Sequence, residues 1–261
     1  MIEAAVREVA TWLAEARAVT VLTGAGISTD SGIPDFRGPQ GVWTRDPSAE
    51  KMFTLQNYRA DPELRVAAWR NRRDHPAWHA EPNLAHRALV DFEHTGGLRA
   101  IVTQNIDELH QRAGSDPARV IEIHGSVFGA ECLECGDRTA MSEALARVAA
   151  GEPDPPCLRC GGVLKSATIS FGQSLRPDVL AAAVEAARSC DLLLAVGTSL
   201  MVHPAAGLCD VARHCGARLV VINGQPTPYD AVADAVIREP IGTVLPALVS
   251  HAADAAASPK R

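Results

Sequence analysis

Four of the seven cysteines have a spacing that suits a metal ion. They form two C-x-x-C pairs with 21 residues between the pairs: Cys132, Cys135, Cys157 and Cys160. Each pair places two thiolates on one tight turn, and two such turns complete a tetrahedral sulfur site for zinc. Because sulfur fills all four positions, we expect a structural zinc ion. The other three cysteines lie singly among apolar residues, where we expect small buried side chains: Cys190, Cys209 and Cys215.

A run of small residues after an apolar stretch suits a nucleotide phosphate. Gly24–Ala25–Gly26 follows residues 18–23, and glycine lets a phosphate approach the backbone closely. The dinucleotide fingerprint would place a third glycine at position 29, where this chain has Thr29. A turn without phosphate contact is therefore an equally good interpretation. Ser28 adds a hydroxyl group, and Arg37 is a candidate phosphate partner.

Two later segments suit the other half of a dinucleotide. Gly197–Thr198–Ser199 follows the apolar stretch 192–196 and offers hydroxyl donors beside a glycine. Asn223–Gly224–Gln225 follows residues 219–222, and in dinucleotide folds an acidic residue at this kind of position binds the ribose hydroxyls. Asn223 could do the same through its amide. A dinucleotide would then span several loops at the carboxyl ends of strands.

The elements that must carry these loops are short apolar segments that alternate with helices. We expect strands at 18–23, 99–103, 120–123, 192–196, 219–222 and 235–237. Helices are expected at 2–16, from about 108 to a stop at Gly114, and in an Ala-rich stretch capped by Asp178. This alternation predicts an α/β fold with a parallel sheet covered on both faces.

Two stretches interrupt the alternation and predict a second, smaller module. Residues 37–82 are polar and aromatic, and residues 131–166 contain the four cysteines. We therefore assign a large domain to 1–36, 83–130 and 167–250 and a small helical and zinc-binding module to the two insertions. Residues 251–261 are rich in Ala, Ser and Lys and are expected to form a flexible tail.

Composition narrows the function classes. The chain has 261 residues, of which 25 are Lys or Arg and 31 are Asp or Glu, so its net charge is −6. That charge argues against a nucleic-acid partner or a membrane partner held by a basic surface. No apolar run approaches the roughly 20 residues that span a bilayer. Charged residues near the N-terminus interrupt any secretory h-region, so we expect a cytoplasmic protein.

Six motifs, taken in order, resemble those of the sirtuins, the NAD-dependent protein lysine deacylases. They are GAGIS at 24–28, GIPDFRG at 32–38, TQNID at 103–107, HG at 124–125, GTSL at 197–200 and NG at 223–224. The four cysteines fall between HG and GTSL, as in that family, and the resemblance covers about residues 18 to 248. It implies a Rossmann-like parallel sheet domain with an inserted small zinc-ribbon and helical domain. NAD and an acylated lysine would meet between the two.

The resemblance also implies roles for individual residues. His124 and Asn105 would be catalytic, with His124 the general base. Gln104, Asn105 and Asp107 would border the nicotinamide and its ribose. The remaining positions implied for NAD binding are Gly24, Ala25, Gly26, Ile27, Ser28, Asp35, Phe36, Arg37, Gly197, Thr198, Ser199, Asn223, Gly224, Gln225 and Ile241.

The residue types fit that chemistry. A base with a pKa near 7 must deprotonate a ribose hydroxyl, and histidine has a suitable pKa. The products implied are free lysine, nicotinamide and O-acyl-ADP-ribose. An ADP-ribosyltransferase would use the same NAD pocket and is the alternative. A hydride-transferring dehydrogenase fits less well because the glycine fingerprint is incomplete, and the acidic net charge speaks against a zinc-ribbon nucleic-acid binder.

An acylated peptide is the implied protein partner. It is expected to add as a strand between Phe171–Gly172 and the loop near Val202. The family often has glutamate where this chain has Gln173, which puts a preference for basic neighbours of the lysine in doubt. His203 is expected at the substrate cleft without a chemical role, His86 as a packing or capping side chain, and His110 facing solvent or a partner element.

The acyl group itself is open between two interpretations. Desuccinylating sirtuins carry a Tyr-x-x-Arg pair that binds an acyl carboxylate, and the matching positions here are Trp69 and Arg72. Tryptophan loses the phenolic hydroxyl but keeps an N–H donor. The alternative is that Arg72 and its neighbouring arginines form a solvated helix face.

Overall fold

The computed structural model describes residues 2–46, 51 and 53–257, and its main element is a six-stranded parallel sheet. The strand order is β3-β2-β1-β7-β8-β9. The bounds are β1 Val19–Thr23, β2 Leu98–Thr103, β3 Val120–Glu122, β7 Leu192–Val196, β8 Arg218–Ile222 and β9 Ala235–Ile237. All six predicted strands are therefore confirmed, as is the α/β fold class.

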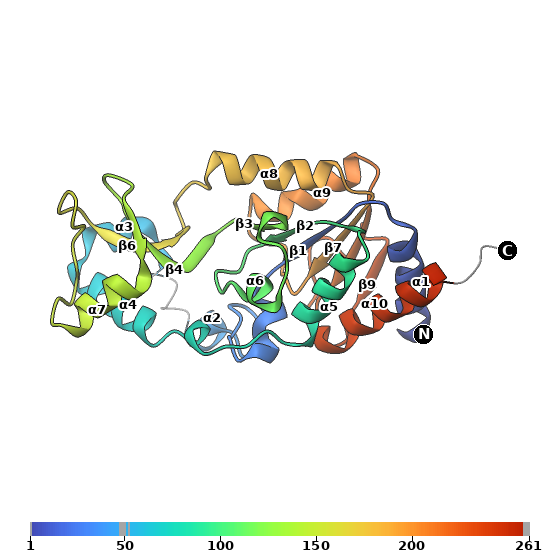
Figure 1. Cartoon of the computed structure of the whole chain (residues 1–261), viewed down its shortest axis with the longest axis horizontal. Helices are drawn as coiled ribbons and strands as arrows, with labels where there is room; N and C mark the ends of the chain where they lie inside the picture. The colour runs from blue at the N-terminus through green and yellow to red at the C-terminus, as the bar shows by residue number, and fades with distance from the viewer. Residues whose placement is uncertain (1, 47–50, 52, 258–261) are drawn as a thin grey trace.

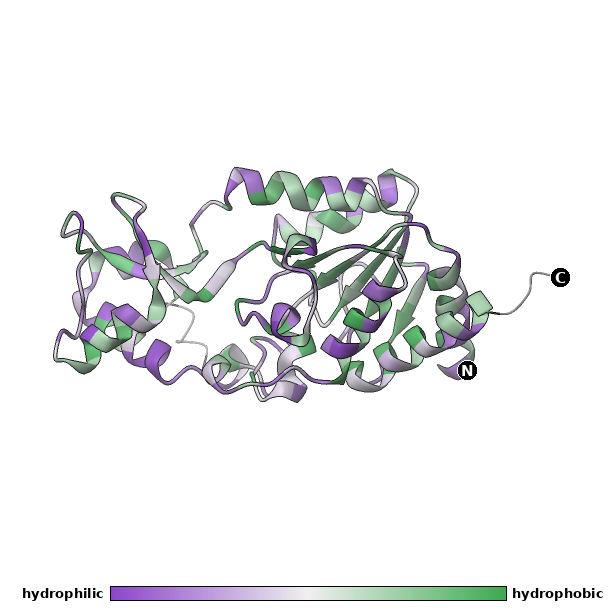
Figure 2. Cartoon of the chain, viewed as in Figure 1, coloured by the Kyte–Doolittle hydropathy of each residue, from purple (hydrophilic) through white to green (hydrophobic). Residues whose placement is uncertain are grey.

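Helices cover both faces of this sheet, as Figure 1 shows, and its central strands β1 and β7 are therefore buried along their whole length. Strand β1 alternates between two cores: Val21 packs on one face and Leu22 on the other. One core is closed by α1 (Ile2–Glu15), α5 (Leu84–His94) and α10 (Ile241–Ala257). The other is closed by α8 (Pro177–Arg188) and α9 (Leu208–His214). Figure 2 shows hydrophobic strands between helices that mix both classes of residue.

A three-stranded antiparallel sheet, which the sequence did not predict, forms the centre of the smaller part of the molecule. Its order is β5-β4-β6, with β4 Gly125–Cys132, β5 Arg138–Ala140 and β6 Leu164–Thr168. Around it lie α3 (Leu55–Ala60), α4 (Pro62–Arg73) and α7 (Met141–Ala149) (Figure 1). The predicted domain limits at 130 and 166 fall inside β4 and β6. The division of the chain into two domains by residue number stays a prediction.

Two expectations about helix ends differ from the structure. Helix α8 begins at Pro177, and Asp178 lies in its first turn, where its carboxylate pairs with Arg176 at 3.2 Å and caps nothing. Helix α10 continues to Ala257, so residues 251–257 of the predicted flexible tail are helical. Residues 258–261 of that tail lie outside the described residues. The apolar positions of α10 carry the helix onward because Leu248 and Ala252 pack into the core.

The remaining helices are short and lie within the connections between the longer elements. They are η1 (Ala25–Ser31), α2 (Val42–Arg45), η3 (Pro76–Trp78), α6 (Leu109–Ala113), η4 (Pro117–Arg119) and η5 (Ala205–Gly207). Helix α6 ends at Gly114, as predicted. Among the helices of the described residues, none is both long and apolar enough to cross a bilayer.

Candidate active site

The two predicted glycine loops pack directly against each other. Gly197 has a φ of +63°, and a Cβ there would lie 2.5 Å from the Ile27 nitrogen. A Cβ on Gly26 would lie 2.8 Å from the Gly197 Cα, and the Gly26 N–H donates to the Gly197 oxygen at 2.9 Å. The glycines are thus required for the contact between the loops after β1 and β7. Ile27 is 1% exposed, and its side chain packs in the core of the large sheet.

A buried hydrogen-bond network lies behind these loops. The Ser28 hydroxyl donates to the Asp107 carboxylate at 2.7 Å, and the Asn105 amide donates to the Ser28 oxygen at 3.1 Å and to the Gly24 carbonyl at 3.2 Å. Burial raises the pKa of Asp107, against bonds from Leu109 and Ser28 that lower it. Loops that are far apart in the chain are thereby brought together around Asn105.

His124 lies between the two sheets, after β3 and before β4. Its Nδ1 is 2.9 Å from the Gln104 carbonyl oxygen. Because a carbonyl can only accept, Nδ1 carries the proton in the neutral ring, and Nε2 keeps its lone pair. Burial lowers the pKa of His124, partly offset by the bond to Gln104. The imidazole is therefore neutral at pH 7 and presents a base.

A second buried hydrogen-bond network, which the sequence did not predict, runs from the Asn105 main chain to His110. The Asn105 N–H donates to the Thr103 hydroxyl at 3.1 Å, which also accepts from Thr23 at 2.8 Å. Thr23 in turn contacts His110 Nε2 at 3.0 Å. His110 is 1% exposed and its ring packs against that of His86 in α5, so of the two expected surroundings it has the partner element and not solvent. Its helix is short, and the buried side chain gave no periodic signal.

His86 is both a packing and a capping side chain, as predicted. Its ring packs against His110 with centroids 5.0 Å apart, and it forms a capping box with Asn83 at the start of α5. The Asn83 amide also donates to the Ile27 carbonyl at 2.8 Å, which ties α5 to the first glycine loop. Burial lowers the pKa of His86 to about 4.

The loops expected for the adenosine half lie at the ends of β7 and β8. Gln104 donates through Nε2 to the Thr198 hydroxyl at 2.9 Å, and Ser199 beside it is half-buried. The Asn223 amide donates to the Gln225 carbonyl at 2.8 Å. Arg238, which the sequence analysis did not single out, donates to the same two residues' carbonyls.

Space for a ligand differs between the glycines of these loops. A Cβ on Gly224 would meet nothing within 4 Å, in contrast to Gly197. Ile241 begins α10, and a Cβ on the next residue, Gly242, would lie 2.6 Å from the Asp30 carboxylate at the end of η1. The open surface beside Gly224 and the hydroxyl groups of the β7 loop are suited to a nucleotide.

The segment Asp35–Arg37 belongs to a cluster of aromatic side chains around Trp43. The Asp35 carboxylate accepts from the Gly38 N–H at 2.8 Å. The ring of Phe36 packs on Trp43 at 4.8 Å, and the Arg37 guanidinium lies 4.5 Å from the centre of the Trp43 ring. Phe171 also contacts Trp43, at 5.4 Å. Aromatic surface therefore joins the predicted cofactor loop to the predicted peptide segment.

The predicted peptide segment already pairs on one side. Phe171 bonds through its N–H and its carbonyl to Phe53 and Leu55, in a parallel bridge centred on Thr54. The Gln173 side-chain oxygen accepts from the Ser170 N–H at 3.1 Å. An amide oxygen accepts as a carboxylate does, so this turn does not require glutamate. Gly172 has a φ of +77° and open space around it.

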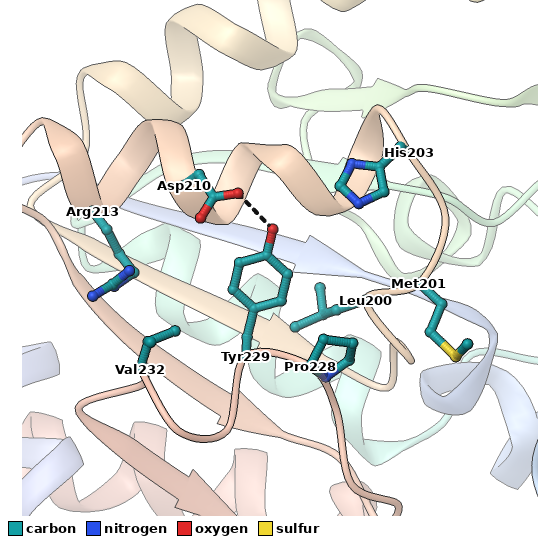
Figure 3. A pocket seen from close by; sticks show the side chains of 8 residues that line it. All are labelled: Leu200, Met201, His203, Asp210, Arg213, Pro228, Tyr229 and Val232. Atoms are coloured by element: carbon teal, nitrogen blue, oxygen red, sulfur yellow. Dashed lines mark hydrogen bonds between the residues drawn. The ribbon is translucent and has the colours of Figure 1, made fainter.

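The loop of Val202 borders an open pocket of about 500 Å³ (Figure 3). Val202 itself is half-buried, and its neighbours Met201 and His203 are exposed pocket-lining side chains. On the opposite side the Tyr229 hydroxyl donates to Asp210 at 2.7 Å, as the dashed line in Figure 3 marks. Burial raises the pKa of Tyr229. A second cavity, of about 740 Å³, lies between the two sheets and is lined by residues of β3, β4, β6 and α8.

Trp69 and Arg72, the two positions that match the Tyr-x-x-Arg pair, lie side by side in the small module. Trp69 is 0% exposed, lies in the core of the small sheet and donates its indole N–H to Asp154 at 3.3 Å. The Arg72 guanidinium stacks over the Trp69 and Tyr58 rings at 4.9 and 5.1 Å. Arg72 is half-buried there, so its surroundings differ from a solvated helix face, and the acyl-binding role of the pair stays a prediction.

The four cysteines of the predicted zinc site come together. Their sulfurs all lie within 4.8 Å of one another, with 3.5 Å between Cys132 and Cys160 and 3.7 Å between Cys135 and Cys157. A tetrahedral ion about 2.3 Å from each sulfur would separate the sulfurs by about 3.8 Å. The four thiolates therefore fit zinc. Of the other cysteines, Cys190 and Cys209 are buried as expected, but Cys215 is exposed.

Comparison with protein families agrees with this arrangement. Residues 24–204 match the model described as the Sir2 family. A relative from Streptomyces coelicolor, named NAD-dependent protein deacetylase 2, is 57% identical over 231 residues, which cover 88% of this chain and 96% of the relative.

Solved structures with the same fold include Sir2 enzymes. One, described as the structural basis for the mechanism and regulation of Sir2 enzymes, has a TM-score of 0.88 and 38% identity, covering 97% of this chain and 99% of the other. Another holds a Sir2 protein with a deacetylated p53 peptide and 3′-O-acetyl-ADP-ribose; it has a TM-score of 0.86 and 33% identity, covering 94% and 97% of the two chains.

Proposed function

The chain belongs to the Sir2 family, and from that premise we propose that it removes acyl groups from protein lysines in a reaction that consumes NAD. When bound, NAD would supply a ribose carbon activated by its nicotinamide leaving group and a ribose hydroxyl that receives the acyl group. One water is consumed, and the products are free lysine, nicotinamide and O-acyl-ADP-ribose. The family's peptide complexes support an acylated peptide as the partner.

The single observation that carries the mechanism is the orientation of His124. Its Nδ1–H is held by the Gln104 carbonyl, so Nε2 is the atom that takes a proton from a ribose hydroxyl. Burial keeps the ring neutral, and the family fold supports NAD in the adjoining loops. A base whose pKa lies below 6.5 is ready to accept a proton at pH 7.

We assign the nicotinamide half of NAD to Asn105 and Asp107, whose side chains are oriented by Ser28. Gly24–Gly26, Asp35–Arg37 and Gln104 border that half, and the adenosine half is assigned to the loops of Thr198 and Asn223. The four cysteines would hold a zinc ion and fill all four of its coordination positions, so its role would be structural.

Mass spectrometry of a peptide incubated with the enzyme and NAD tests the proposal. An acetyl-lysine peptide should lose its acetyl group, with one nicotinamide and one O-acetyl-ADP-ribose formed per turnover. His124→Ala should lower kcat by roughly a hundredfold or more, because general-base catalysis contributes about that much. His94→Ala, at an exposed histidine in the last turn of α5, is the matched control and should retain activity.

Other outcomes would identify a different reaction. Transfer of ADP-ribose to protein without loss of the acetyl group would favour the ADP-ribosyltransferase. Formation of NADH would favour a dehydrogenase. Deacetylation that proceeds without NAD would contradict the proposal.

For the acyl group we propose a preference for short neutral chains. The support is that Trp69 is fully buried and the Arg72 guanidinium is held between the Trp69 and Tyr58 rings. Turnover of acetyl- and succinyl-lysine forms of one peptide, by wild type and Arg72→Met, tests this. We expect Arg72→Met to change both rates by a similar factor, and a loss confined to the succinyl peptide would show that Arg72 binds the acyl carboxylate.

A further inference from the structure

Glu108 has a backbone conformation that is unusual for its residue type. It directly follows Asp107 and precedes α6, with a φ of +55° and a ψ of 18°. This left-handed region suits glycine, whereas a residue with a Cβ is strained there. Strained residues persist where the surrounding contacts hold them, and they are frequent at functional sites. The contacts of the Glu108 side chain therefore need an explanation.

The side chain of Glu108 spans two elements of the active site. The Ser126 hydroxyl donates to the Glu108 carboxylate in a short bond, and the same hydroxyl accepts from the Phe128 N–H at 3.1 Å. Ser126 lies near the start of β4, two residues after His124. Glu108 belongs to the loop that carries Asn105 and Asp107. The bond thus joins the two segments that hold the base and the nicotinamide side of the site.

Neighbouring bonds along the same boundary use main-chain oxygens. The Val127 N–H donates to the Ile106 carbonyl at 2.9 Å, and the Ile123 N–H donates to the Thr103 carbonyl at 2.9 Å. His124 adds its bond to the Gln104 carbonyl. Glu108 adds one more hydrogen bond between the same two segments, at the end nearest α6. Side-chain hydrogen bonds to charged groups are stronger than neutral ones, so it can set the spacing of the two segments.

We propose that Glu108 is a positioning residue, which through Ser126 sets the distance between the Asn105–Asp107 loop and the His124 imidazole. The inference rests on the proposed deacylase function and adds a residue to its site. A shift of about 1 Å between reacting groups can lower a rate by up to about a hundredfold, so the loss of one such bond is expected to affect catalysis more than binding.

The surroundings of Glu108 support this role. Its carboxylate lines the cavity of about 740 Å³ between the two sheets, together with Ser126 and Glu122. Glu122 Oε1 is buried without a hydrogen-bond partner. Burial, and then the negative charge of Glu108, raise the pKa of Glu122 to about 7. Ser126 therefore provides the hydroxyl that stabilises Glu108 beside a second carboxyl group.

Steady-state kinetics of four variants test the proposal. Glu108→Ala and Ser126→Ala should each lower kcat by roughly tenfold, while the KM for NAD and for peptide changes by less than about twofold. The double variant should be no slower than either single one, because both remove the same bond. Glu108→Gln should retain most of the activity, because its amide oxygen still accepts from Ser126.

Glu108→Gly separates positioning from stability. It removes the carboxylate but relieves the left-handed strain, so its melting temperature should equal or exceed that of wild type while kcat falls roughly tenfold. Glu131→Gln changes a carboxylate that lines the same cavity but pairs with Arg138. It is the matched control and should leave kcat unchanged.

The outcomes distinguish this inference from the function on which it rests. If wild type deacylates with NAD and both Glu108→Gly and Ser126→Ala match it in kcat, Glu108 does not position the site. Losses that are additive in the double variant, or that follow melting temperature across the series, would also overturn the inference. If wild type shows no NAD-dependent deacylation, the proposed function itself fails.

Discussion

At the scale of single residues, the tautomer of His124 decides what the site can do. Its Nδ1–H is committed to a main-chain carbonyl at 2.9 Å, and that partner cannot change by a side-chain rotation. Nε2 is thereby defined as the acceptor. Sequence alone identified His124 by its motif, but its protonation state follows from a contact to Gln104, 20 residues away.

We predict that kcat/KM depends on pH through His124. Burial lowers its pKa below the usual 6.5, so the ring stays neutral from pH 8 down to about 6.5 and becomes a protonated non-base only at lower pH. The activity should therefore be level across pH 7–8 and fall on the acid side, below pH 6.5. Initial rates at subsaturating peptide from pH 5 to 8.5 provide the measurement. A fall that begins above pH 7 would contradict it.

We predict that the buried histidines make folding sensitive to acid. Burial lowers the pKa of His86 to about 4 and that of His110 well below 6.5. Both histidines bind protons near pH 6.5 in the unfolded chain but not in the folded one, so their contribution to stability is lost as the pH falls below 6.5. For His86 the loss between pH 7 and pH 5 is about 2 kcal/mol.

Urea unfolding at pH 7 and pH 5 measures that loss. In His86→Gln the titrating group is absent, and the difference between the two pH values should shrink by about 2 kcal/mol. An equal difference in wild type and variant would show that His86 is protonated in the folded protein.

At the scale of elements, the loops at the carboxyl ends of β1 and β7 act as a unit. Their glycines approach so closely that a Cβ on either side would overlap the other loop. Gly24–Ala25–Gly26, which resembles an incomplete phosphate fingerprint, therefore has a packing role between the two loops. This explains why Thr29 can replace the third glycine without disturbing the contact, since the contact involves Gly24, Gly26 and Gly197.

We predict that Gly197→Ala destabilises the protein by about 2–5 kcal/mol. The new Cβ would combine left-handed strain, about 1–2 kcal/mol, with overlap against the Ile27 nitrogen, about 1–3 kcal/mol. Gly216→Ala is the matched control, because Gly216 has a φ of +90° but nothing within 4 Å. It should lose only about 1–2 kcal/mol. Urea unfolding of both variants measures the difference, and equal losses would exclude the overlap.

At the scale of the whole molecule, β4 connects the two sheets (Figure 1). It begins beside His124 and ends at Cys132, one of the four cysteines. The His124 carbonyl also accepts from the Ile169 N–H at 2.8 Å, just beyond β6. The metal site and the base are therefore joined through both long strands of the small sheet.

We predict that removing zinc unfolds the small sheet and abolishes activity. Structural zinc contributes many kcal/mol to small folds, so the melting temperature of Cys160→Ser should fall by at least about 10 °C and its zinc content to near zero. Cys215→Ser changes an exposed cysteine outside the site and should retain both. Zinc analysis and thermal unfolding provide the measurements. A zinc-free variant with wild-type melting and turnover would contradict this.

The sequence by itself determined the parallel sheet, because short apolar segments alternate with helices, and the central strands β1 and β7 are buried along their whole length. It also identified the cysteine site and the loops that meet in the cleft, since turn geometry and ligand chemistry are encoded within a few residues. Only the tertiary structure showed that Trp69 and His110 are buried. Their partners, Asp154 and Thr23, are 85 and 87 residues away, and no local pattern specifies such a contact. The small sheet and the Glu108–Ser126 bond depend on distant contacts in the same way.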